Sequence, residues 1–594
     1  MGGLSRRAFI GGSLGLAAAW ALPHEALADK LFSQLMPSEG ASTLQQTIRL
    51  GAIQRNSYRS LIAAAGEPYV ARYDILGKVA NANRFQTRRS LFYCAHLSDI
   101  HIVDAQSPAR LEPLIEQDHE LWGGAFRPQE TLTTHVTSSM VQSVAELRNS
   151  PVTGAPLAAS FVTGDSADML SHLETRWYID ILDGTPFVAN SGESGIYDGV
   201  QAWQEAFWAY HPHLAGSDQF TQYGFPHIPG MLKAAVTETV DSGGLPVPWY
   251  TVYGNHDTIY YGTFGVPSSL NDLAVGNRKF YDWKFEVADY FGDWTAESSA
   301  IGRALHSMSR SSGMALGARP VAADPQRKLL EQKDFMRAHF DTTVNPGPIG
   351  HGFNKSNLET GRTYWSQDVN SFVRAFGLDS CNQVAGPDGA ISEAQFNWLE
   401  AELAAAQREG KLCIILSHHN SFTLENSAEL ATDPGKLIHA EEFIAMVLKY
   451  PTAIAWLNGH THNNTITAHK GENGGFWEIT TASCIDFPQQ QQTVEIVDNG
   501  DGTLSIFTTV LDHLSDAHWN GALTSSGLAS LSRELSANDW AANPVMRIGS
   551  ELDRNTELLL PAPFDLSTIS AAAVEKDQAN STARLMAWQN GWAS

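Results

Sequence analysis

Cysteine and positively charged residues are both scarce in this sequence. Four cysteines occur among 594 residues, and no two of them form a Cys-x-x-Cys pair. The sequence therefore indicates neither a disulfide framework nor a zinc-thiolate site, and it leaves open whether Cys381 and Cys484 pair. Lys and Arg number 39 against 64 Asp and Glu, which gives a net charge of −25. This acidity argues against nucleic acid or an anionic membrane as the main partner.

Long hydrophobic runs are absent as well. The apolar run at residues 8–22 is diluted by glycine, and it falls short of the roughly 20 residues that span a bilayer. The twin arginine Arg6-Arg7 precedes it, and the small-x-small pattern Ala26-Leu27-Ala28 follows. This arrangement resembles a bacterial twin-arginine (Tat) signal. We therefore expect residues 1–28 to be removed after export by the Tat translocase. The mature chain is then periplasmic, cell-wall associated or secreted, with no stable membrane anchor.

Hydrophobic residues make up 43% of the chain, which excludes disorder as its main state. Five short apolar runs predict strands that are buried on both faces. They are Leu91–Leu97, Ala158–Thr163, Pro248–Tyr253, Leu412–Leu416 and Ala453–Leu457.

Two helices are predicted between the later strands. Ser392 and Gln395 form a capping box at the start of a helix that ends near Gln407, and a second helix covers roughly Ala440–Tyr450. Strands that alternate with helices predict an α/β fold.

The remaining segments suggest how the chain is organised. Thr493–Val497 and Thr503–Leu511 read as a β-hairpin. Two long intervals, about 172–246 and 262–388, are expected to be folded insertions, because unstructured loops of that length are rare. We predict an N-terminal extension at 29–88, a main domain at 89–512 and a C-terminal extension at 513–594.

Each of the five predicted strands is followed at once by side chains that bind metals. In chain order these are Asp99 and His101, Asp165 and Asp168, Asn255 and His256, His418 and His419, and His460 and His462. Open α/β sheets place their sites at strand C-termini, so five distant segments can converge on one crevice. Oxygen and imidazole ligands without thiolate suit Mn, Fe, Zn or Mg. Asp99 and His101 are two residues apart, as are His460 and His462, so an ordinary strand would point each pair to one side.

The ordered series Asp-x-His, Gly-Asp, Gly-Asn-His, His and Gly-His-x-His resembles the calcineurin-like metallophosphoesterase superfamily. The resemblance covers roughly residues 89–173, 246–260 and 390–510, and all five blocks are complete. The chain looks most like exported bacterial members with long insertions between the motifs. The resemblance implies an αββα sandwich of two mixed β-sheets flanked by helices.

The resemblance also implies a role for each motif residue. Asp99, His101 and His462 would hold one metal ion, Asn255, His418 and His460 a second, and Asp165 would bridge the two. A hydroxide bridging the metals would attack the phosphorus. His256 would contact the phosphate and protonate the leaving oxygen, and Asp168 would pair with His256.

The sequence therefore predicts an enzyme, a metal-dependent hydrolase of phosphoric esters that acts on a small molecule. A phosphomonoesterase is favoured, because Ser417-His418-His419-Asn420 lacks the proline that often follows His-His in diesterases of the superfamily. A phosphodiesterase for cyclic nucleotides or glycerophosphodiesters remains an alternative, as does a non-catalytic metal-binding scaffold.

Other polar residues are expected to have structural or surface roles. His419 is expected behind the ligands, and His96 in strand packing. His211 and His213 flank Pro212 in an insertion without evident acidic partners, so a surface turn is expected there. Asp104 is expected to be a solvated loop carboxylate.

Overall fold

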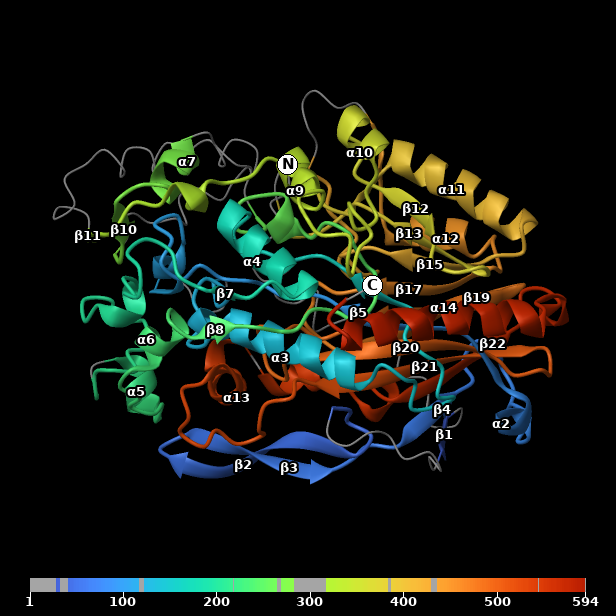
Figure 1. The fold of residues 1–594 in the computed structure, drawn as a ribbon, viewed down its shortest axis with the longest axis horizontal. Coiled ribbons are helices and arrows are strands. Elements are labelled where there is room, and N and C mark those ends of the chain that lie inside the picture. Colours follow the sequence, from blue (N-terminus) through green and yellow to red (C-terminus); the bar gives the residue numbers. More distant parts are fainter. Residues whose placement is uncertain are drawn as a thin grey trace, which may run out of the picture.

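The computed structural model describes residues 28–31, 41–116, 122–216, 218–263, 269–282, 317–382, 386–428, 435–542 and 544–592. Residues 1–27 of the predicted signal peptide lie outside these ranges. The described chain contains an eight-stranded sheet, a six-stranded sheet and several two-stranded pairs, with helices packed around them (Figure 1). The predicted mixed α/β fold is confirmed. Among the described helices, none combines the length and apolar character that crossing a membrane requires.

The eight-stranded sheet carries the first three motif strands. Its order is β1 (Ala28–Leu31), β4 (Tyr69–Arg72), β22 (Thr556–Pro561), β21 (Thr503–Asp512), β20 (Gln490–Asp498), β5 (Arg89–Leu97), β6 (Ala159–Val162) and β9 (Trp249–Thr251). The strands β5, β6 and β9 run parallel, while β20 and β21 form the predicted hairpin. The sheet also takes β4 and β22 from the segments before residue 89 and after residue 512.

The six-stranded sheet carries the last two motif strands. Its order is β12 (Trp365–Asp368), β13 (Val373–Gly377), β15 (Leu412–Leu416), β17 (Ala453–Asn458), β19 (Gly474–Thr480) and β18 (Thr465–Gly471). The four inner strands are parallel, and the two outer strands are antiparallel to their neighbours.

The two large sheets share one hydrophobic core. Alternate residues of each strand point to opposite faces, so Phe92 of β5 and Ile414 of β15 lie in the shared core. The neighbouring residue Tyr93 packs with α3 (Thr133–Glu146) and α4 (His172–Asp183). On the other sheet, Ile415 packs with α11 (Glu393–Arg408) and α12 (Ala440–Val447). Helices therefore cover both outer faces.

The smaller elements complete the described chain. The helices are α2 (Arg84–Thr87), α5 (Gln219–Tyr223), α6 (Met231–Ala235), α7 (Ser269–Ala274), α9 (Gln332–Ala338), α10 (Lys355–Thr360), α13 (Ser525–Ala537) and α14 (Ala571–Gln589). The strands are β2 (Gln46–Arg55), β3 (Tyr58–Ala65), β7 (Phe187–Val188), β8 (Thr239–Val240), β10 (Arg278–Phe280), β11 (Ala318–Pro320), β14 (Ile391–Ser392) and β16 (Leu437–Ile438).

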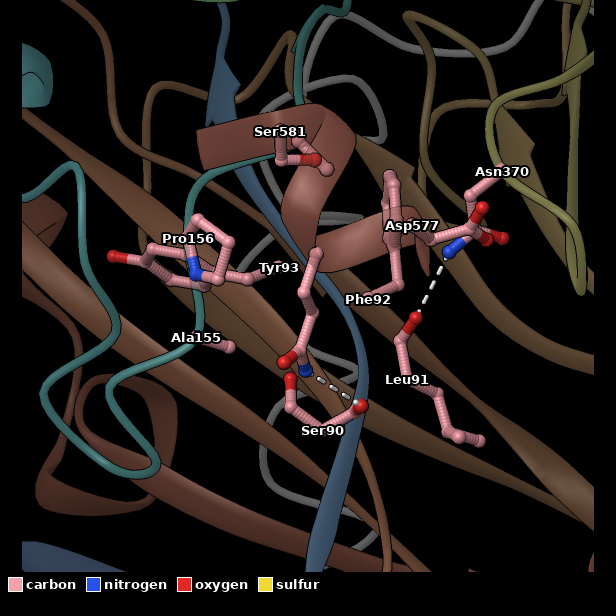
Figure 2. Close-up of a pocket in the computed structure, with 11 residues that line it drawn as sticks. Ser90, Leu91, Phe92, Tyr93, Ala155, Pro156, Asn370, Asp577 and Ser581 are labelled. Atoms are coloured by element: carbon pink, nitrogen blue, oxygen red, sulfur yellow. Dashed lines mark hydrogen bonds between the residues drawn. The ribbon is translucent and has the colours of Figure 1, made fainter. Parts of the chain in front are cut away.

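The C-terminal helix α14 lies beside β5 and encloses a small pocket there (Figure 2). Asn370 donates a 2.8 Å hydrogen bond to the carbonyl of Leu91 on one side, and Gln578 of α14 donates to the carbonyl of Ser90. None of the predicted site residues lines this pocket.

The structure differs in detail from the capping box that the sequence predicts, and it answers whether Cys381 and Cys484 pair. The hydroxyl of Ser392 accepts from the amide of Gln395, as a cap should, but the Gln395 side chain binds the main chain of Asp379. Only half of the predicted capping box therefore forms. All four cysteines are buried and free, and Cys381 lies against the carbonyl of Tyr253, so no Cys381–Cys484 bridge is present.

Candidate metal centre

The loop after the first motif strand is joined to the loop after the second, and the loop after the fourth to the loop after the fifth, by main-chain hydrogen bonds. The amide of Asp99 donates to Gly164, that of His101 to Asp165, and that of Gly459 to His418, at 2.9–3.0 Å. The amide of His460 donates to the carboxylate of Asp99. Both sheets therefore present their loops to the same place, as the positions of the motifs predict.

Asp99, His101 and His462 form one compact group that could hold a metal ion. Nε2 of His462 lies 3.2 Å from Oδ1 of Asp99 and 3.2 Å from Nε2 of His101. All three residues are buried. These are the three residues that the sequence assigns to one ion.

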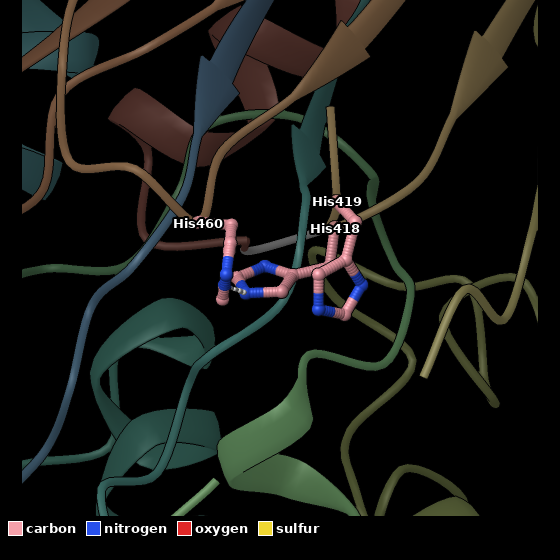
Figure 3. A group of neighbouring side chains, drawn as sticks. All are labelled: His418, His419 and His460. Atoms are coloured by element: carbon pink, nitrogen blue, oxygen red, sulfur yellow. Dashed lines mark hydrogen bonds between the residues drawn. The ribbon is translucent and has the colours of Figure 1, made fainter. Parts of the chain in front are cut away.

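Asn255, His418 and His460 form a second group beside the first. Nδ1 of His460 lies 3.1 Å from Nε2 of His418 and 3.1 Å from Oδ1 of Asn255. The approach of the His418 and His460 rings is drawn in Figure 3. These are the residues that the sequence assigns to the other ion.

Asp165 lies between the two groups. Its Oδ2 is 3.5 Å from Nε2 of His101 and 3.1 Å from Nε2 of His418. Its Oδ1 accepts a hydrogen bond from the amide of His256, which fixes the carboxylate with Oδ2 toward the histidines. One oxygen atom therefore faces both groups.

The backbone of the ligand residues is not that of ordinary strands. Asp99, His101, Asp165, His460 and His462 all have positive φ, between 48° and 69°. Non-glycine residues rarely adopt this left-handed region. The expected strand geometry for Asp99–His101 and His460–His462 is therefore wrong, because these residues lie beyond the strand ends. Left-handed turns, not strand alternation, bring the paired side chains to one place.

Glycine is required where these loops approach one another. A Cβ atom on Gly164, which has a φ of +92°, would lie 2.6 Å from the amide nitrogen of Gly254 and 2.8 Å from Nδ1 of His418. A Cβ on Gly459 would overlap the side chains of Ser98 and Asp99. Both glycines thus permit contacts that no other residue allows.

The hydrogen bonds of Nδ1 determine which ring nitrogen of His101 and of His462 faces the site. Nδ1 of His101 lies 2.9 Å from Oδ1 of Asp168, and Nδ1 of His462 lies 2.7 Å from Oδ2 of Asp486. Because carboxylates only accept, each Nδ1 carries the proton, and in the neutral rings each Nε2 presents a lone pair. The two Nε2 atoms lie 3.2 Å apart. A cation between them satisfies both, so the donor set fits a metal ion.

The electrostatics of the site also suit a cation. Burial raises the pKa of Asp165, but His418 and His256 outweigh it and hold the pKa well below its usual value. Burial lowers the pKa of His418, but Asp165 and Asp99 outweigh it and raise the pKa to about 9. Burial, His419 and His418 hold the pKa of His460 well below normal. A bound metal ion would replace the proton on His418, since metal ligands bind deprotonated.

The side chains of Asp168 and His256, which the sequence pairs, lie within ion-pair distance but share no hydrogen bond. The carboxylate of Asp168 binds His101 and Arg110, and its Oδ1 is 3.9 Å from Nδ1 of His256, beyond hydrogen-bond distance. His256 instead donates from Nδ1 to the main-chain carbonyl of Asp168 at 2.7 Å. Residue 168 still orients His256, but through its backbone, because its side chain is needed behind His101.

Sequence reasoning missed the residues that support these carboxylates. Asp486 receives hydrogen bonds from His462 and Arg127 and an ion pair from Arg547, and Arg110 binds both Asp168 and Glu130. None of them follows a motif strand closely. Their only sequence signal is their charge, which does not distinguish them from surface residues.

The sequence predicts no metal ligation for His96, His419, His211 and Asp104, and the structure agrees with only some of the roles expected for them. His96 is buried in the sheet and binds Thr163, as expected. His419 packs 4.4 Å from His460 between ring centroids, but its nitrogens bind Ser380 and Pro387, so it offers no free nitrogen.

The other two expectations are wrong. His211 is buried, with its Nδ1 3.7 Å from Asp218, because that carboxylate folds back over it. Asp104 is buried too, and it binds Ser191 and Arg327, a residue of the second insertion.

Comparison with solved structures finds a dimetal phosphatase from Danio rerio, at 10% sequence identity and a TM-score of 0.31. The match covers 72% of this chain and 100% of that one. No family model and no curated protein matches the sequence. A likeness this distant carries no functional argument, so the function is argued from the geometry of the site.

Proposed function

We propose that this protein is a dinuclear-metal phosphoesterase of the calcineurin-like type, built on that superfamily's αββα sandwich, and that it hydrolyses phosphomonoesters. The observation that carries the proposal is the position of Asp165. Its Oδ2 lies within 3.5 Å of a histidine from each ligand group. A single carboxylate oxygen in this position suits a bridge between two cations. The shared core of the two sheets and their covering helices support the sandwich.

Two divalent ions held by these residues would supply the Lewis acidity that polarises a phosphate ester and activates water. The chain's own residues position the ions. Asp99, His101 and His462 surround one position, Asn255, His418 and His460 the other, and the carboxylates of Asp99 and Asp165 balance part of the cationic charge.

His256 is the proposed proton donor to the leaving oxygen. Its Nδ1 is committed to the carbonyl of Asp168, so Nε2 remains to exchange a proton with substrate. The His256 side chain is 17% exposed, whereas Asp168 beside it is fully buried. A substrate can therefore reach His256 from solvent.

A small-molecule monoester is the proposed substrate. The missing proline after His418-His419 weakens a diesterase assignment, and His419 has no free nitrogen to offer a second ester group. The net charge of −25 disfavours nucleic acid. We further propose export by the Tat route, on the evidence of the residues around Arg6-Arg7 and Ala26-Leu27-Ala28.

The test is hydrolysis of p-nitrophenyl phosphate and bis-p-nitrophenyl phosphate by the metal-free chain reloaded with Mn, Zn, Fe, Ca or Mg. We expect faster hydrolysis of the monoester. Asp165→Asn should lower kcat/KM by at least about 100-fold, since metal clamping supplies several kcal/mol at 1.36 kcal/mol per tenfold. The matched control is Asp368→Asn, at a carboxylate that is 42% exposed in a surface ion-pair network.

The outcomes separate the alternatives. Faster diester hydrolysis would replace the monoesterase with a diesterase. Two bound ions without hydrolysis of either ester would support a non-catalytic scaffold instead. Equal rates for Asp165→Asn and the parent would contradict the role given to Asp165.

A further inference from the structure

Asp486 lies directly behind His462, on the side away from the proposed metals. Its Oδ2 is 2.7 Å from Nδ1 of His462, and the carboxylate is fully buried. Nε of Arg127 donates to its Oδ1 at 2.7 Å, and a guanidinium nitrogen of Arg547 lies 2.8 Å from its Oδ2. One carboxylate therefore joins the histidine to two arginines.

The three charged residues come from distant parts of the chain. Asp486 follows strand β19, Arg127 precedes helix α3, and Arg547 lies in a 3-10 turn, Pro544–Ile548, of the C-terminal segment. Arg547 is fixed in turn, because its Nε donates to the carbonyl of Ala542. The amide of Asn464, two residues after His462, donates to the carbonyl of Arg547. The C-terminal segment thus contacts the loop of His462 through both side chain and main chain.

We propose that Asp486, held by Arg127 and Arg547, is a positioning residue for His462, and that the C-terminal segment thereby completes one of the two metal positions. The proposal rests on the proposed function, since it assumes that His462 binds a metal ion.

The physical argument starts from the imidazole ring. A histidine ligand whose other nitrogen donates to a carboxylate is fixed in orientation and tautomer, and it is a more basic ligand. A buried carboxylate is stable only when it is paired, and here two guanidinium groups pair with Asp486. Removal of Arg547 would weaken the hold on Asp486. Neutralisation of Asp486 would leave Arg127 and Arg547 uncompensated, with the positive field of both beside a cation site.

The other ligand group provides an internal reference. Nδ1 of His418 donates to the main-chain carbonyl of Thr163 at 2.8 Å, a contact that contains no charged side chain. A change at Arg547 or Asp486 should therefore affect the ion held by Asp99, His101 and His462, and it should spare the ion held by Asn255, His418 and His460.

The experiment is a Mn²⁺ titration of the metal-free full-length chain, followed by calorimetry and by electron paramagnetic resonance. The variants are Arg547→Ala, Arg547→Lys and Asp486→Asn. Arg319→Ala is the control, at an arginine that is 43% exposed and pairs with Glu205 on the surface. Melting of each metal-free variant is measured in parallel. Arg547 is 21% exposed, so its variants keep the test informative even if Asp486→Asn fails to fold.

We expect the parent to bind two ions with a spin-coupled signal. In Arg547→Ala, one dissociation constant should rise about 10–100-fold while the other stays within about threefold. The signal at limiting Mn²⁺ should then be that of an isolated ion. Arg547→Lys should recover most of the affinity, because a lysine keeps one charged hydrogen bond, and Asp486→Asn should lose at least as much as Arg547→Ala.

Two results would overturn the proposal: unchanged affinities in both Arg547→Ala and Asp486→Asn, or an equal loss at both positions together with a lower metal-free melting temperature. The second result would mean that the residues serve only the fold. A parent that binds two ions but hydrolyses neither ester would remove the proposed function and leave this test valid. A parent that binds no ion would overturn both.

Discussion

Gly164 offers the sharpest test of the close approach between motif loops. Its φ of +92° lies in the left-handed region, and a Cβ there would lie 2.6–2.8 Å from three atoms of the site, namely the amide nitrogen and Cα of Gly254 and Nδ1 of His418. Gly254 directly precedes Asn255, so Gly164→Ala would push apart two segments that carry ligands of the same metal position.

The size of the effect follows from two separate contributions. Alanine at positive φ costs about 1–2 kcal/mol of stability, and overpacking in a filled site costs about 1–3 kcal/mol more. A ligand displaced by several tenths of an ångström also misplaces the reacting groups, and a shift of about 1 Å can cost about 100-fold in rate. We therefore expect Gly164→Ala to lose about 2–5 kcal/mol of unfolding free energy and about 10–100-fold in kcat/KM.

Gly154→Ala separates the two contributions. Gly154 has a φ of +77°, but a Cβ there has nothing within 4 Å, so this variant carries the backbone strain without the collision. Urea unfolding and hydrolysis of p-nitrophenyl phosphate are measured for both variants. Gly154→Ala should lose about 1–2 kcal/mol and keep its activity. Equal stability losses in the two variants, or parental kcat/KM in Gly164→Ala, would refute the packing argument.

Two further predictions concern stability. Arg84 and Glu557 form a buried bidentate pair, at 2.9 and 2.6 Å, between residues before 89 and after 512. Arg84→Met should lose about 2–3 kcal/mol in urea unfolding, because it removes both charged hydrogen bonds of the pair and leaves Glu557 the longer 3.2 Å ion pair with Arg88. An unchanged midpoint would contradict this. Burial and the nearby Asp486 raise the pKa of Asp539 to about 7. Between about pH 4 and pH 7 the folded chain then binds more protons than the unfolded chain, so this group's contribution to stability falls as pH rises through that window. Asp539→Asn should remove this fall, gaining on the order of 2–4 kcal/mol relative to the parent between about pH 4 and pH 8, and an equal difference at both pH values would show that Asp539 is ionised throughout.

The strands, and the grouping of the predicted site residues, were predictable because both depend on local patterns. Leu412–Leu416 is a strand with the predicted bounds, since five consecutive apolar residues between polar ends are buried on both faces. The seven ligand residues follow such strands, and the carboxyl ends of parallel strands meet at one edge. Strand order accounts for the convergence within each sheet, and the packing of the two sheets against each other brings the two sets of loops together.

The outer support of the site was not predictable, because it depends on pairings between remote segments. Asp486 and Arg127 are separated by 359 residues, and no local period connects them. Asp168 was assigned to His256 by its position in a motif, yet Arg110, 58 residues earlier, holds its carboxylate toward His101. Burial of Asp104 has the same cause, since Arg327, 223 residues later, contacts it. The partner of His211 is nearer, because Asp218 follows it by seven residues.

The left-handed backbone of the predicted ligands depends on both the local motifs and the contacts between loops. Five of the seven predicted ligands have positive φ, and a non-glycine residue in a sparsely populated region costs about 1–3 kcal/mol. Such strain persists only where surrounding contacts enforce it, and here the amides of Asp99, His101 and His460 are each held by a neighbouring motif loop. The turns direct carboxylates and imidazoles to a common point. Groups of like charge lie close together there. The strained residues and the crowded side chains therefore coincide in the same groups, which could hold metal ions.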